Sequence, residues 1–85
     1  MHTVELLEHA LIAASRLGFK VRQEWLNASG GVCVIKGQKW IFLDHGQTPF
    51  EQMAIVVEAL RGEPGLERLN LDGELRKYLG VRRSA

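Results

Sequence analysis

Three kinds of side chain in this 85-residue sequence could take part in chemistry: one cysteine, three histidines and ten acidic residues. Cys33 as nucleophile, His45 as base and Asp44 as the group orienting the imidazole would make a catalytic triad. Cys33 stands in an apolar run, however, where we expect a buried structural thiol with little thiolate character. Asp44 and His45 are adjacent, so their side chains diverge in an extended chain. We therefore expect no catalytic residue and no enzyme activity.

Metal and cofactor sites also lack their usual patterns. The histidines share no ligand spacing with one another or with Cys33, and neither C-x-x-C nor H-x-x-x-H occurs. Gly30 and Gly31 precede a predicted strand, whereas a phosphate-binding loop leads into a helix. We expect neither a metal nor a cofactor.

The composition is 46% hydrophobic and 25% charged, with a formal net charge of +1. These values predict one globular domain over residues 1–85, with a folded part at 1–80 and a flexible basic tail at 81–85. They favour neither strong nucleic-acid attraction nor a membrane role. A single cysteine is typical of a reducing compartment, and the start of the chain has no basic leader. We expect a cytoplasmic protein.

Local signals predict the helices. Apolar residues at helical spacing indicate a helix that Thr3 caps and that ends at Gly18. Thr48, Pro49 and Glu51 form a capping-box pattern for a second helix, which runs to about Arg61. Its apolar side is expected to hold Phe50, Met53, Val56, Val57 and Leu60. A short C-terminal helix follows Asp72.

Three strands are expected between the long helices. Residues 19–26 alternate like a half-buried strand, with Phe19, Val21 and Trp25 on its apolar side, and 27–30 form a turn. A hairpin over 32–43 then turns at Gly37-Gln38 and sets Cys33 opposite Phe42. This order, α-β-β-β-α plus a short C-terminal helix, predicts an α+β fold with a three-stranded antiparallel sheet and two long helices on one face.

The hairpin has no polar face. One face holds Cys33, Ile35, Trp40 and Phe42, and the other holds Val32, Val34, Ile41 and Leu43. We take the Cys33 face as core because it is bulkier and contains the cysteine. A simple turn at 27–30 would pair Trp25 with Val32 and favours the other face.

The second face needs a cover. The C-terminal helix could supply one through Leu75, Tyr78 and Leu79, or another chain could, most simply a second copy. Two isoleucines on polar helix sides favour association. The candidate interface residues are therefore Ile12, Val32, Val34, Ile41, Leu43 and Ile55.

The α-β-β-β-α order resembles double-stranded-RNA-binding domains and HicA-type toxins. The first family implies a lysine cluster where this chain begins its second helix with Pro49 and Phe50. The second implies Gly-Ser-His where this chain reads Gly-Gly-Val-Cys at 30–33. Weak RNA binding therefore stays an alternative, without those motifs. The basic patch available for it would contain Lys20, Arg22, Lys36 and Lys39.

Residues 30–60 contain G-G-x-C-x-x-K-G from Gly30, F-L-D from Phe42 and P-x-E-Q from Pro49. These motifs resemble a small group of uncharacterised bacterial proteins, to which no activity is assigned. The resemblance thus implies no site residue. We favour a protein-interaction module that self-associates through an apolar sheet face. Its expected partner is a second copy or another protein, with nucleic acid less favoured and no membrane partner.

Overall fold

The computed structural model describes residues 2–25 and 30–80. Its elements, in chain order, are α1 (Thr3–Arg16), β1 (Lys20–Glu24), β2 (Gly31–Ile35), β3 (Gln38–Asp44), α2 (Pro49–Arg61), the 3-10 helix η1 (Leu66–Arg68) and α3 (Gly73–Leu79). This order confirms the predicted α+β class. Residues 27–29 of the expected turn and the expected tail at 81–85 lie outside the described residues.

The sheet is mixed, so the prediction of a purely antiparallel sheet is wrong. Its strand order is β1-β3-β2, with β3 antiparallel to β2 and parallel to β1. The last strand in sequence is therefore the middle strand in space. The His45 N–H donates to the Glu24 carbonyl at 2.9 Å, just beyond the paired residues. Residue alternation predicts which side chains share a face, but it does not determine which strands are neighbours.

The β2–β3 hairpin turns one residue earlier than expected, at Lys36 and Gly37 (φ 50° and 80°). Two positive φ values are typical of a type I′ turn, whose twist matches that of the flanking strands. Cys33 consequently lies opposite Trp40 instead of Phe42. Each partner moves by two residues along β3, so the two faces keep their predicted members.

The helices α1 and α2 cover one face of the sheet, and that face is not the predicted one. Ile41 and Leu43 are fully buried, whereas Cys33 is exposed. The assignment of the Cys33 face to the core is therefore wrong, because α1 and α2 lie on the Ile41 side of β3. The core residues are Leu6, Leu7, Ala10, Ala13, Ala14, Phe19, Ile41, Leu43, Met53, Val56, Val57, Leu60, Leu66, Leu75 and Leu79.

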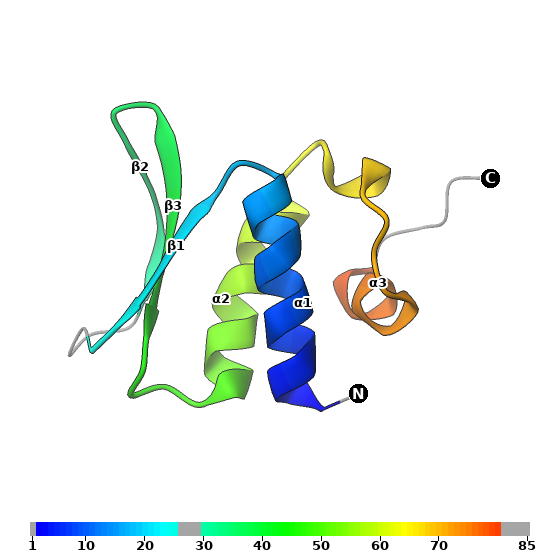
Figure 1. Cartoon of the computed structure of the whole chain (residues 1–85), viewed down its shortest axis with the longest axis horizontal. Coiled ribbons are helices and arrows are strands. Elements are labelled where there is room, and N and C mark those ends of the chain that lie inside the picture. Colours follow the sequence, from blue (N-terminus) through cyan, green and yellow to red (C-terminus); the bar gives the residue numbers. More distant parts are fainter. Residues whose placement is uncertain (1, 26–29, 81–85) are drawn as a thin grey trace.

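The molecule has three layers, with the α1–α2 pair between the sheet and α3 (Figure 1). Leu75 and Leu79 of α3 are buried in the core cluster that α1 and α2 share, while Tyr78 remains 40% exposed. The proposal that this helix covers the second sheet face is therefore wrong. The C-terminal helix lies on the far side of the helical layer.

The helix starts are formed largely as predicted. The Glu51 N–H donates to Thr48 Oγ1 at 3.1 Å, and the Thr48 N–H donates to Glu51 Oε1 at 2.9 Å, which confirms the capping box of α2. Asp72 caps α3 as expected. Thr3 does not cap α1, because it is already the first helical residue; His2 takes the N-cap position and makes no side-chain cap bond.

Gly30, which leads into β2, lies very close to the middle strand. A Cβ atom at this position would stand 2.0 Å from the carbonyl oxygen of Phe42, a distance that no real side chain tolerates. A Cβ atom at the neighbouring Gly31 would meet nothing within 4 Å. The two adjacent glycines therefore allow a direct comparison, because a side chain would clash at Gly30 but not at Gly31.

We predict that Gly30→Ala lowers the free energy of unfolding by about 1–3 kcal/mol, the usual cost of overpacking. Gly31→Ala should change it by less than about 0.5 kcal/mol. Urea denaturation of both variants measures the difference. Equal stability of the two variants would show that the entry to β2 does not approach Phe42 as described.

Candidate functional site

The sheet face turned away from the helices, here called the outer face, is formed by all three strands. The pairing register places Lys20 of β1 beside Trp40 of β3, and Cys33 of β2 on the other side of the same tryptophan. Outer-face residues therefore sit in rows across the sheet. The members of this face used below are Lys20, Arg22, Cys33, Ile35, Trp40 and Phe42.

Two stacked aromatic rings occupy the centre of the outer face. The rings of Trp40 and Phe42 have centroids 5.8 Å apart and planes inclined by 17°. Lys20 Nζ lies 5.6 Å from the Trp40 centroid, within the range of a cation–π contact. Arg22 forms an ion pair of 2.8 Å with Glu24 on the same strand. Among the six outer-face residues named above, the aromatic pair lies at the centre and the two charged residues lie on β1.

The strand β2 exposes apolar side chains in both directions. Val32 and Val34 point to the helix side of the sheet yet remain 47% and 65% exposed, and Ile35 on the outer face is 46% exposed. The hairpin tip lies beyond the ends of α1 and α2, so no helix covers it (Figure 1). Cys33 is exposed because it lies on the outer face, away from the helices, so the prediction that it is buried is wrong. We call Val32, Cys33, Val34, Ile35, Trp40 and Phe42 the hairpin surface.

The predicted interface residues divide into accessible and inaccessible ones. Val32 and Val34 are exposed, but Ile41 and Leu43 are completely buried beneath the helices, so assigning these two to an interface was wrong. Ile55 is partly buried and packs against the core cluster, so it is not stranded on a polar surface.

Ile12 is 55% exposed and lines a hollow of about 280 Å³ between α1 and residues 69–75. Known small-molecule pockets begin at roughly 300 Å³, so this hollow is at their lower limit. It lies on α1, remote from the hairpin surface. The structure therefore does not bring Ile12 together with the valines of β2.

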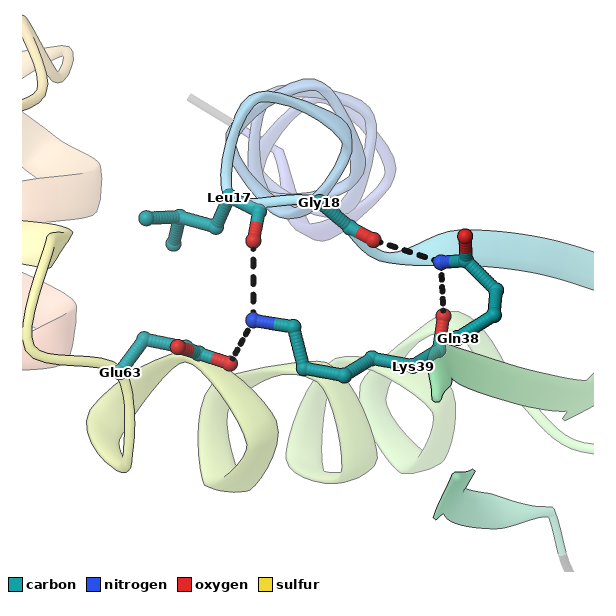
Figure 2. Close-up of polar contacts among 5 residues, drawn as sticks. All are labelled: Leu17, Gly18, Gln38, Lys39 and Glu63. Atoms are coloured by element: carbon teal, nitrogen blue, oxygen red, sulfur yellow. Dashed lines mark hydrogen bonds and ion pairs between the residues drawn. The ribbon is translucent and has the colours of Figure 1, made fainter. Parts of the chain in front are cut away.

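Lys39 was expected in an exposed basic patch, and that expectation is wrong. Figure 2 shows its ammonium between α1 and the loop after α2, where it donates to the Leu17 carbonyl at 2.9 Å and to Glu63 Oε1 at 2.5 Å. It also lies 4.6 Å from the centroid of the Phe19 ring. Lys39 is on the helix side of β3, as its sequence parity with Ile41 requires. Only Lys20, Arg22 and Lys36 of the predicted patch remain at the surface.

Gln38 adds a second link between β3 and the C-terminal end of α1. Its Nε2 donates to the Gly18 carbonyl at 2.7 Å and to the Lys39 carbonyl at 2.9 Å (Figure 2). Two consecutive side chains of β3 therefore bind carbonyls at the C-terminal end of α1, which a helix cannot satisfy by itself. Sequence spacing gave no signal for this, because the contacts join residues far apart in the chain.

The three residues that were considered for a triad and rejected are not brought together. Cys33 lies opposite Trp40, whereas Asp44 ends β3 and His45 follows it. Asp44 is buried, and its Oδ1 accepts the Gly46 N–H at 2.9 Å. The His45 ring instead lies 5.5 Å from that of Trp25, which is 78% exposed and outside β1. Asp44 shapes the turn after β3.

Gln52 is a structural residue that sequence reasoning missed. It is 7% exposed, and its Nε2 donates to the carbonyls of Asp44 and Gln47, each at 3.1 Å. Phe50, predicted on the buried side of α2, is 67% exposed. Hydrophobic type alone favoured Phe50 for the core, although the turn before α2 has carbonyls that only a donor can satisfy.

Residues 2–25 and 30–80 contain no group of three histidine, cysteine, aspartate or glutamate side chains that could hold a metal ion. Within the same residues, no helix is both long enough and apolar enough to cross a membrane. No family model matches the chain, and no curated protein or solved structure matches it either.

We predict that Lys39→Met lowers the free energy of unfolding by about 1–3 kcal/mol, because Glu63 and the Leu17 carbonyl would lose a charged donor. Lys20→Met is the matched control: this lysine is exposed, and the loss of its contact with Trp40 should cost less than about 1 kcal/mol. Chemical denaturation of both variants provides the comparison. If Lys39→Met is as stable as Lys20→Met, the connection to α1 does not stabilise the fold.

Proposed function

We propose that this chain is a small protein-interaction module that self-associates through its hairpin surface. The observation that carries the proposal is that the helices cover only one face of an apolar sheet. The other face exposes Cys33 and Ile35 beside the stacked pair of Trp40 and Phe42. Contiguous apolar surface of this kind is typical of contact sites.

Contiguity separates the hairpin surface from other exposed apolar residues. Val4, Phe50 and Tyr78 are also exposed, but each stands on a different helix. Single exposed hydrophobic residues are normal on monomeric proteins. On the hairpin, by contrast, Cys33 and Ile35 lie on the same face as the Trp40–Phe42 pair, and fully burying a large apolar side chain is worth about 1.5–3 kcal/mol.

The charges of the molecule are compatible with a second copy as partner. No charged side chain occurs among the six residues of the hairpin surface, and the net charge of +1 causes little repulsion between copies. Closed twofold dimers are the commonest assemblies of soluble proteins. A self-complementary apolar patch therefore favours the same chain over a charged partner.

RNA binding is the second candidate, and one observation supports it. Lys20 lies over Trp40, which stacks on Phe42, and aromatic rings beside cations are typical of surfaces that bind single-stranded nucleic acid. The charge available is small, however. Lys39 is bound on the helix side, and Arg22 is paired with Glu24. We therefore favour protein contact.

We predict that the purified chain is a dimer at high micromolar concentration in sedimentation equilibrium. Ile35→Lys should raise its dissociation constant more than tenfold, which corresponds to about 1.4 kcal/mol, because a charge would enter an apolar contact. Val4→Lys is the control, since Val4 is similarly exposed (51% against 46%) but lies on α1. A wild-type chain that stays monomeric contradicts the proposal, as does an equal effect of the two substitutions.

The same samples test the second candidate. We expect fluorescence anisotropy with a labelled single-stranded RNA at low salt to show no binding that depends on Trp40. The wild-type chain and the Trp40→Ala variant should therefore give the same anisotropy. Binding that is lost in Trp40→Ala and weakens as salt rises would instead favour a nucleic-acid surface.

A further inference from the structure

The free edge of β2 carries none of the features that normally prevent strands from pairing between molecules. β2 is an outer strand of the sheet, and among the described residues it pairs with β3 alone. From Gly31 to Ile35 it has no charge and no proline. The opposite edge, β1, carries Lys20, Arg22 and Glu24. Charged residues on an edge strand oppose intermolecular pairing, so only one of the two edges is protected.

We propose that two copies of this chain pair antiparallel, β2 against β2, around a twofold axis at Cys33. The proposal rests on the proposed self-association and assigns the contact to the edge of β2: Val32, Cys33, Val34 and Ile35 meet the second copy, while Trp40 and Phe42 stay uncovered on the joint outer face. The dimer would contain one continuous six-stranded sheet, in which the outer faces of the two copies form a single surface.

The turn geometry shows which backbone groups are available at this edge. In a two-residue type I′ hairpin, the residues that flank the turn form a hydrogen-bonded pair, here Ile35 and Gln38. Bonded and non-bonded pairs alternate along an antiparallel ladder. Cys33 is therefore bonded to Trp40, whereas Val32 and Val34 direct their N–H and C=O groups away from β3.

These groups define the register. When Cys33 lies on the axis, Val32 pairs with Val34 of the second copy and Val34 with its Val32, which satisfies every outward group of the two valines. Among symmetric registers, this is the one in which all five residues of β2 are paired. Lys36 then lies opposite Gly30 of the second copy, so no like charges meet.

The register places the two Cys33 thiols next to each other. They form a non-hydrogen-bonded pair, in which Cα atoms are about 4.5 Å apart. A disulfide requires a Cα separation of roughly 4.4–6.8 Å, so the pair can be cross-linked. Copper phenanthroline in air serves as the oxidant: two thiols lose two protons and two electrons to dioxygen, and one S–S bond forms. The disulfide is a probe of proximity and is not proposed as a physiological bond.

The first experiment compares cross-linking of the full chain with that of a Cys33→Ser/Val34→Cys variant, both read on non-reducing gels. The wild-type chain should cross-link at least tenfold faster, because residues 34 of the two copies are offset along the strands and point to the opposite face. Equal rates in both chains would indicate random collision and overturn the register.

The second experiment tests the backbone bonds. Val34→Pro removes one outward N–H and leaves the bonded pairs of the hairpin intact, whereas Val34→Ala keeps that N–H and loses similar side-chain volume. In sedimentation equilibrium, Val34→Pro should raise the dissociation constant at least tenfold more than Val34→Ala. Circular dichroism checks that both variants are folded.

The outcomes separate the two proposals. A wild-type chain that is monomeric up to the millimolar range overturns both self-association and edge pairing. A wild-type dimer that resists Cys33 cross-linking overturns edge pairing alone, even if Val34→Pro fails to fold. Cross-linking together with selective weakening by Val34→Pro supports the edge-paired dimer.

Discussion

The architecture depends on one constraint: β3 is the middle strand, and helices cover only one of its faces. Ile41 and Leu43 give the helical layer its contact with the sheet and are completely buried. The same strand must direct Trp40 and Phe42 to the opposite side, where none of the described helices lies. Because side chains alternate along a strand, an apolar β3 cannot bury both sets at once. The exposed outer face is a direct consequence of a core built from the other face.

The hairpin is anchored at one end and uncovered at the other. Lys39 and Gln38 join the start of β3 to the carbonyls at the end of α1, and Glu63 holds the lysine from the loop after α2. At the other end of β3, Gln52 bonds the Asp44 carbonyl and fixes the turn that leads into α2. β2 pairs with β3 and otherwise contacts α2 only weakly, so its position depends mainly on pairing with β3. The same strand exposes Val32, Val34 and Ile35.

Features determined by nearby residues could be predicted from the sequence. The Thr48–Glu51 capping box and the membership of the two hairpin faces require only local spacing, and both were correct. Strand order, the choice of core face and the ion pair of Lys39 with Glu63 depend on residues far apart in the chain, and no local pattern contains that information. Cys33 illustrates the limit: its apolar neighbours indicated burial, but β2 proved to be an edge strand.

The contrast between the two sheet edges determines which assemblies are physically reasonable. Pairing of β2 with β1 of another copy would join unlike edges and could continue indefinitely, as heterologous contacts do. Such pairing would bring the apolar β2 against Lys20, Arg22 and Glu24, which must then give up part of their solvation. Pairing of β2 with itself involves no charged side chain within the strands and closes after two copies. An uncharged edge on one side and a charged edge on the other therefore favour a finite dimer over a filament.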